Sequence, residues 1–223
     1  LRTNKVYSPF PEEANRQLIA RIADLHFSPT DLSKKNLIKE NIPKEKIFVV
    51  GNTAIDALFL TKKIIKNDFS DYDFIKSMPF LEFCKNKKIV LVTGHRRENF
   101  GEGFKNICDA LIDIANISKE VLIVFSVHLN PKVNTYIKNK LKNTTNIFTI
   151  NPLNYFNFVK LMDLSYFIMT DSGGVQEEAP SLGKPVLVLR EFTERPEAVK
   201  VGTVKVVGTS KSKIFYYAKK AFN

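Results

Sequence analysis

The sequence predicts an α/β protein with parallel sheets, in which a complete doubly wound domain follows part of a second α/β unit. Three observations lead to this class. The 223 residues are 44% hydrophobic and 26% charged, the composition of a globular protein with a buried core. From Lys87 onward, apolar runs of strand length alternate with helical patterns. These runs are apolar at consecutive positions, as in parallel strands that helices cover on both faces, so we expect a Rossmann-like domain.

The elements of this domain can be placed in order. Runs such as Ile89-Val-Leu-Val-Thr93 are apolar throughout and end at turn residues, as buried strands do. The expected strands cover residues 89–93, 121–127, 147–150, 166–170, 185–189 and 203–207. The expected helices cover residues 104–117, 132–142, 155–162 and 175–182. In such sheets ligands bind beyond the C-terminal ends of the strands, so the loops after these strands are the candidate site.

The first fifty residues predict only a fragment of a second α/β unit. Pro11 and the two following glutamates open a helix that reaches about residue 23, because proline and carboxylates both suit a helix N-terminus. Strands at 25–28 and 47–50 flank a helix at 31–40, and so few elements cannot enclose a core. A helix at 52–66 and a polar stretch to Lys88 follow. We therefore expect a remnant of a first domain at 1–51 and a complete domain at 52–223. Because the sequence opens with Leu1 instead of Met, we also expect N-terminal sequence to be missing.

The net charge and the lengths of the apolar runs limit the classes of partner that the protein can bind. The net charge of +11 suits an anionic ligand, but the lysines are scattered, so nucleic-acid binding is a weak alternative and no nucleic-acid partner is expected. No apolar run approaches the roughly 20 residues that cross a bilayer, and no secretory signal opens the chain. We expect a cytoplasmic protein without a membrane partner. Cys84 and Cys108 lack the spacing of metal ligands and are expected to be core thiols.

The strongest local motif is Thr170-Asp-Ser-Gly-Gly-Val175, which joins an expected strand to an expected helix. Gly173 and Gly174 let the backbone approach a ligand, free N–H groups attract phosphate, and Ser172 adds a hydroxyl donor. Glu178 lies one turn further, where a carboxylate can accept the hydroxyls of a ribose. A plain turn with a helix cap is the alternative.

Two further loops should face the same edge of the sheet. Arg195 follows the next strand and can clamp a diphosphate, although a surface ion pair with Glu194 or Glu197 is the alternative. Phe158 could stack on a base, although an aromatic residue on an amphipathic helix is more often part of the core.

The segment Thr93-Gly-His-Arg-Arg-Glu-Asn99 ends a central strand, where His95 can donate to phosphate or act as an acid or base near neutral pH. His128 has the same topological position with less chemistry around it, and His26 is expected to be structural. No zinc, Walker or nucleophile-elbow motif is present in the sequence, so we expect neither metal nor covalent serine chemistry.

Six motifs together resemble the non-hydrolysing UDP-N-acetylglucosamine 2-epimerases, in the same order and over essentially the whole chain. They are Leu1-Arg-Thr with 7–16, Gly51-Asn-Thr-Ala-Ile-Asp56, Gly94-His-Arg-Arg-Glu-Asn99, Val127-His-Leu-Asn-Pro131, 170–185 and Thr193-Glu-Arg-Pro-Glu-Ala198. The resemblance implies a GT-B-like pair of Rossmann-like domains. It also implies interconversion of UDP-GlcNAc and UDP-ManNAc in the synthesis of cell-surface polysaccharide, a homodimer, and no NAD or metal cofactor. In this reaction a base removes the C2 proton, UDP leaves to give 2-acetamidoglucal, and UDP adds back.

The resemblance also implies roles for individual residues. Ser172, Gly173 and Gly174 would cradle the diphosphate, with Arg195 as a further phosphate contact and Glu178 on the ribose. The backbone of Leu153 and the ring of Phe158 would flank the uracil. The catalytic residues would be His95, which stabilises the departing diphosphate, and Glu12, an acid/base carboxylate. The residues that resemble contacts to a second, allosteric UDP-GlcNAc are Arg96 and His128.

The sequence departs from the family at both ends. The N-terminal half of the first domain, with its glycine loop and further acidic residues, is missing, and the C-terminal helices end early. An acid/base pair that spans a cleft needs both walls, so complete catalysis by this chain alone is in doubt. The alternatives are a separate N-terminal polypeptide that completes the enzyme, a UDP-binding remnant without turnover, and, less favoured, a GT-B glycosyltransferase.

Overall fold

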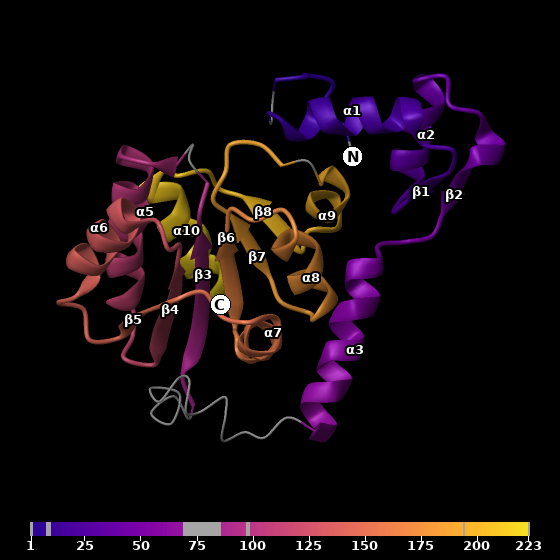
Figure 1. Cartoon of the computed structure of the whole chain (residues 1–223). Helices are drawn as coiled ribbons and strands as arrows, with labels where there is room; N and C mark the ends of the chain where they lie inside the picture. The colour runs from indigo at the N-terminus through magenta and orange to yellow at the C-terminus, as the bar shows by residue number, and fades with distance from the viewer. Residues whose placement is uncertain (1, 8–9, 69–85, 97–98, 194, 223) are drawn as a thin grey trace. The chain divides into compact units, whose positions relative to one another are not determined.

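The computed structural model describes residues 2–7, 10–68, 86–96, 99–193 and 195–222 (Figure 1). The chain divides into two compact units, Leu1–Ala57 and Leu58–Asn223, with the division inside helix α3 (Thr53–Asp68). No helix in the described ranges has both the length and the apolar character that crossing a membrane requires.

The second unit is built on a six-stranded sheet in which every neighbouring pair is parallel. Its strands are β3 (Lys88–Gly94), β4 (Val121–Val127), β5 (Ile147–Ile150), β6 (Phe167–Thr170), β7 (Val186–Val188) and β8 (Val204–Val206). The spatial order is β5-β4-β3-β6-β7-β8. The chain therefore winds outward from β3 in one direction and from β6 in the other, which makes the β3–β6 pair the topological switch point of a Rossmann-like sheet.

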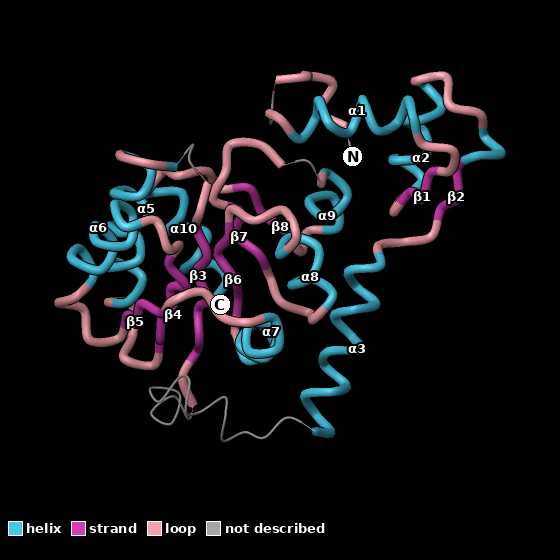
Figure 2. The backbone as a smooth tube through the Cα atoms, viewed as in Figure 1, coloured by secondary structure: helices cyan, strands magenta, loops and turns pink. Residues whose placement is uncertain are grey.

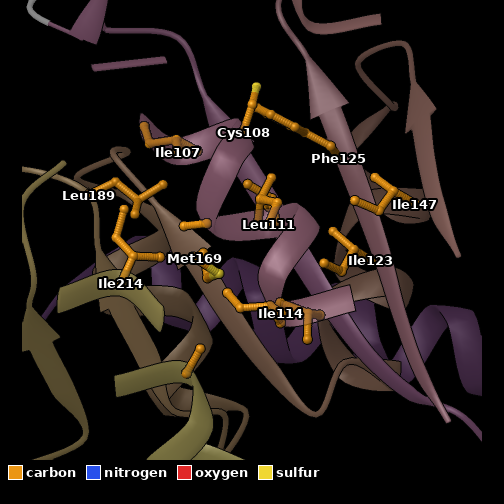
Figure 3. Packing of buried hydrophobic residues seen from close by; sticks show 14 of the residues in the cluster. Ile107, Cys108, Leu111, Ile114, Ile123, Phe125, Ile147, Met169, Leu189 and Ile214 are labelled. Atoms are coloured by element: carbon orange, nitrogen blue, oxygen red, sulfur yellow. The ribbon is translucent and has the colours of Figure 1, made fainter. Parts of the chain in front are cut away.

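Helices cover both faces of this sheet (Figure 2). They are α5 (Glu102–Ala115), α6 (Pro131–Leu141), α7 (Tyr155–Leu164), α8 (Val175–Ser181), α9 (Pro196–Val201) and α10 (Lys211–Phe222). On one face α5, α6 and α10 pack against alternate strand residues such as Val90 and Val92, and on the other α7 and α8 pack against Leu91. Figure 3 shows Leu111 and Ile114 of α5 beside Ile123 of β4. Consecutive strand residues are buried on opposite faces, which explains the continuous apolar runs.

The expected α/β class with parallel sheets is confirmed, and each expected strand lies within about two residues of an observed one. Among the α-helices of the described residues, α9 and α10 were not expected from the sequence. The six residues of α9 are too few for a periodic pattern, and α10 is a basic segment that buries Ile214 and Ala218. Cys108 is buried and its thiol is free, as expected of a core residue, whereas Cys84 lies outside the described residues.

The first unit contains α1 (Glu12–Ile22), β1 (His26–Ser28), α2 (Asp31–Lys39), a short 3-10 helix (Lys44–Lys46) and β2 (Ile47–Val49). The two strands pair in parallel. The N-cap of α2 is Thr30, whose side chain accepts from the Ser33 N–H. Little apolar surface is buried in this unit, and several large side chains are exposed, among them Leu18, Ile19, Ile22, Phe27 and Phe48. Parallel sheets normally have both faces covered, whereas Phe27 and Phe48 of this sheet are exposed.

Candidate functional site

The candidate site lies where β3 and β6 end at the switch point. Gly94 ends β3 and is followed by His95, and Thr170 ends β6 and is followed by Asp171. The strands are aligned with Thr93 opposite Thr170, and the two buried hydroxyl oxygens are 2.6 Å apart. The Thr170 hydroxyl also accepts from the Ser172 N–H at 3.0 Å. These contacts tie the start of the glycine loop to the central strand.

Asp171 joins the two loops that leave β3 and β6. Its side chain is fully buried, and it accepts hydrogen bonds from the backbone N–H of His95 at 3.0 Å, of Arg96 at 2.9 Å and from the amide of Asn99 at 3.0 Å. The imidazole Nδ1 of His95 also lies 3.0 Å from its Oδ1. Burial alone would raise the pKa of Asp171, but the donors from His95 and Arg96 outweigh burial and lower this pKa, so the carboxylate is ionised at neutral pH.

The glycine loop is fixed from behind by Gln176. This buried side chain donates to the Ser172 carbonyl oxygen at 3.1 Å and accepts from the Thr193 hydroxyl at 2.6 Å. Thr193 in turn accepts from the Arg195 N–H at 3.2 Å. The loops after β6 and β7 are therefore connected through side chains. Within the described part of the chain, the N–H groups of Gly173 and Gly174 make no hydrogen bond, which leaves them available to a ligand.

Arg195 lies directly on Gly173. An ideal Cβ at Gly173 would be 2.5 Å from Arg195 Nη1 and 2.9 Å from Cζ, so only glycine leaves room for this guanidinium. The Nε of Arg195 donates to Glu177 at 2.7 Å. The alternative raised above was an ion pair with Glu197 or with Glu194, which lies outside the described residues; the structure pairs Arg195 with Glu177. The backbone of Gly174 remains open, because a Cβ there would meet only Glu178 Oε2, at 3.9 Å.

Glu178 is held by an unexpected partner, Tyr155 at the start of α7, whose hydroxyl donates to Glu178 Oε1 at 2.8 Å. Burial and this hydrogen bond raise the pKa of Tyr155 to about 12, so the phenol remains protonated and can donate. Leu153 and Phe158 are partly buried against the core on the face of the sheet that α7 and α8 cover. Phe158 thus packs as a core residue while staying partly accessible.

The remaining expected residues divide between the two units. His128, exposed at the end of β4, stacks on His95 with ring centroids 6.4 Å apart, and it accepts from the Asn130 N–H. Glu12 is exposed on α1 in the first unit. The buried carboxylate of that helix is the neighbouring Glu13, which accepts from Gln17 and Arg16. Burial opposes ionisation of Glu13, but the donors from Gln17, Thr3 and Arg16 lower its pKa.

The structure thus brings the residues expected at the diphosphate and ribose to the ends of β6 and β7, and it brings His95 beside them through the β3–β6 pairing. Sequence reasoning missed the supporting residues of this site, which are Asp171, Gln176, Thr193 and Tyr155. Asp171 lies inside the glycine motif and Gln176 directly follows it, so an ionisable and an amide side chain beside the glycines were the available signals. Nothing comparable marked Tyr155. Among the described residues, no group of three or more His, Cys, Asp or Glu could hold a metal ion.

Comparisons with known proteins identify the family of the chain. The sequence model of the UDP-N-acetylglucosamine 2-epimerase family matches residues 1–223. The chain belongs to this family. A UDP-N-acetylglucosamine 2-epimerase from Campylobacter jejuni is 55% identical over 222 residues, which are 99% of this chain and 58% of that protein.

Solved structures of the family also match nearly the whole of this chain and somewhat over half of their own length. The UDP-GlcNAc 2-epimerase from Neisseria meningitidis, bound to UDP-GlcNAc, matches with a TM-score of 0.92 and 47% identity over 99% of this chain and 59% of that one. S. aureus MnaA in its co-structure with UDP matches with a TM-score of 0.89 and 43% identity, over 100% of this chain and 57% of that one. The chain therefore spans somewhat over half the length of the epimerases that it matches.

Proposed function

We propose that this chain supplies the UDP-binding half of a UDP-N-acetylglucosamine 2-epimerase, an isomerase that interconverts UDP-GlcNAc and UDP-ManNAc. The observation that carries the proposal is the meeting of Gly173, Gly174, Arg195 and Glu178 at the switch point of a doubly wound sheet. Relatives that match this whole chain are named as bound to UDP-GlcNAc or UDP, which supports the ligand class.

The diphosphate is proposed to bind between the backbone and Arg195. The open N–H groups of Gly173 and Gly174, with the Ser172 hydroxyl, would donate to phosphate oxygens from one side. Arg195, already held over Gly173 by Glu177 and Thr193, would donate from the other. Because these groups are held before the ligand arrives, little conformational entropy is lost on binding.

The nucleoside is proposed to extend from the glycine loop toward α7. Glu178 would accept the ribose hydroxyls, with its second oxygen oriented by Tyr155. The backbone of Leu153 and the partly accessible ring of Phe158 would flank the uracil, since both lie on the α7 side of the sheet. This arrangement would hold UDP while the sugar fragment reorients.

The proposed chemistry proceeds by elimination and addition. A base removes the C2 proton, the anomeric C–O bond breaks, and its electron pair leaves with UDP to give 2-acetamidoglucal. UDP then adds back at C1 as C2 is protonated on the opposite face. His95 would stabilise the charge on the departing diphosphate, and Glu12 is the proposed acid/base carboxylate.

The catalytic half is proposed to be completed by polypeptide outside this chain, either as part of a longer protein or as a separate N-terminal polypeptide. The support is the coverage of about 58% of a relative's length and the exposed apolar side chains of the first unit, such as Ile22, Phe27 and Phe48. The homodimer, the allosteric UDP-GlcNAc contacts through Arg96 and His128, and the cytoplasmic location stay predictions.

A UDP-binding protein without turnover is the second candidate function, because the chain lacks the length of its relatives. The test is to incubate the purified chain with UDP-GlcNAc in D₂O and to follow UDP-ManNAc and the C2 proton by ¹H NMR, alone and with the N-terminal part of a relative. Product with deuterium at C2 supports the epimerase. UDP binding with no product in either mixture favours the binding protein, and transfer or hydrolysis of the sugar without change at C2 indicates a glycosyltransferase.

A further inference from the structure

A buried ionised carboxylate in the candidate site has no role in the chemistry above. Asp171 is fully buried and directly follows the central strand β6, next to the loop that carries His95. An ionised group in such a place is costly unless donors surround it. Here three donors bind it, the two backbone N–H groups of His95 and Arg96 and the amide of Asn99.

These bonds orient His95 as well as satisfy Asp171. The backbone donors fix the start of the loop, and Asn99 fixes its end, because the Asn99 amide also donates to the Leu189 carbonyl at 3.2 Å. The ring is placed by a further contact, Nδ1 at 3.0 Å from Asp171 Oδ1. The His95 side chain is 42% exposed, whereas Asp171 is inaccessible. One edge of the imidazole therefore faces the carboxylate and the rest is open.

The chemistry of the carboxylate decides which nitrogen carries the proton. An ionised Asp can only accept hydrogen bonds, and Nδ1, 3.0 Å from Oδ1, is the ring nitrogen placed to donate to it. A neutral imidazole that donates to this carboxylate carries its proton on Nδ1 and presents a lone pair at Nε2. Hydrogen bonding to the carboxylate by the other nitrogen is the ordinary way in which a protein selects a histidine tautomer.

We propose that Asp171 is a positioning residue that holds His95 in the Nδ1–H tautomer and thereby makes Nε2 the nitrogen that meets the diphosphate. Nε2 takes a proton from solvent, and the imidazolium that forms donates its Nε2–H hydrogen bond to a phosphate oxygen while the carboxylate stabilises the positive charge. The lowered pKa of Asp171 agrees with a carboxylate that stays ionised in this pair. The role of Nε2 rests on the proposed function, whereas the tautomer does not.

The test is ¹⁵N NMR of the histidine side chains in the 223-residue chain over a pH series, read where the His95 signals are those of a neutral imidazole. The chain has three histidines, so His95→Gln identifies the signals of His95. The expected result is a protonated Nδ1 and an unprotonated Nε2. A protonated Nε2 with a bare Nδ1 in the wild-type chain overturns the proposal.

Two variants separate tautomer selection from support of the loop. In Asp171→Asn the amide NH₂ can face Nδ1, so the proton should move to Nε2 while the volume of the side chain is kept. Asn99→Ala removes the hydrogen bonds that Asn99 donates to Asp171 and to the Leu189 carbonyl, but it leaves the carboxylate of Asp171 in place. The Nδ1–H tautomer should therefore persist. Equal tautomer changes in both variants, or no change in Asp171→Asn, contradict the proposal.

A UDP titration keeps this inference apart from the proposed function. When UDP is added to the wild-type chain, the signal of Nε2 should shift more than that of Nδ1. A chain that shows the Nδ1–H tautomer but binds no UDP contradicts the proposed function and supports the positioning of His95. A chain that binds UDP with the Nδ1 signal shifted more than Nε2 contradicts the proposed use of Nε2.

Discussion

The guanidinium of Arg195 occupies the space that a side chain at Gly173 would need. A Cβ at this glycine would lie 2.5 Å from Nη1, and the arginine is fastened there by Glu177 and by the Thr193 hydroxyl. Gly173 therefore has a second role besides letting the backbone approach a ligand. Because it has no side chain, the guanidinium of Arg195 can pack directly against its Cα. A positive group and open N–H donors consequently meet at one place, as diphosphate binding requires.

Gly173→Ala should weaken UDP binding about tenfold, because the added methyl displaces Arg195 and a charged hydrogen bond contributes about 1.5 to 3 kcal/mol. Isothermal titration calorimetry with UDP measures this. The φ angle of Gly173 is not positive, so the substitution carries no backbone strain. In an Arg195→Ala background the same glycine substitution should cost little more. Additive losses would show that Gly173 acts independently of Arg195.

Tyr155→Phe should lower UDP affinity about fivefold, because Glu178 loses a hydrogen bond worth about 1 kcal/mol. Titrations with UDP and 2′-deoxy-UDP measure the effect. The wild-type chain should prefer UDP, and Glu178→Gln should reduce that preference strongly. If Glu178→Gln leaves the preference intact, Glu178 does not bind the ribose.

Thr193→Val should destabilise the fold by about 1 to 3 kcal/mol, because the buried Gln176 oxygen loses its donor without a change in side-chain volume. Urea denaturation measures the free energy of unfolding. The matched control is Thr203→Val, whose hydroxyl makes only a 3.5 Å contact with Ala198 at an exposed position, and it should stay within about 0.5 kcal/mol of the wild type. Equal effects of the two substitutions would contradict the role given to Gln176.

Cys108 should make stability fall in alkaline solution. Burial, helped by Asp109, raises the pKa of its thiol from 9.0 to about 12. Above pH 9 the unfolded chain loses this proton and the folded chain keeps it, so the contribution is complete below the unfolded pKa and is lost toward the folded one. Between about pH 8 and 10.5, the free energy of unfolding should drop by about 2 kcal/mol more for the wild type than for Cys108→Ala. Parallel pH profiles would contradict this.

Much of the fold could be predicted because strands that are buried on both faces of the sheet are apolar at consecutive positions. The strand Val121–Val127 is apolar at nearly every position, and its bounds were predicted correctly. The pattern fails where one face is polar and only a few residues are buried. In α10 the buried residues Ile214 and Ala218 lie among lysines and tyrosines, so nothing marked the segment as a helix of the domain.

The sequence predicted those parts of the candidate site that lie within one loop. It did not predict contacts between residues that are far apart in the chain. The glycine loop and Arg195 were predictable because each directly follows an expected strand. The bond from the His95 backbone to Asp171 joins residues 76 positions apart and exists because β3 is next to β6. Strand order is set by the packing of all six strands, and no single motif encodes it. The pair Tyr155–Glu178 depends in the same way on α7 and α8 covering one face.

A crystal structure of this chain with UDP tests the central claim most directly, namely that loops at the β3–β6 switch point grip one diphosphate. The account predicts phosphate oxygens within hydrogen-bond distance of the Gly173 or Gly174 N–H and of the Arg195 guanidinium, with the ribose at Glu178. A diphosphate bound away from these glycines, or an Arg195 that leaves Gly173 without touching phosphate, would contradict it.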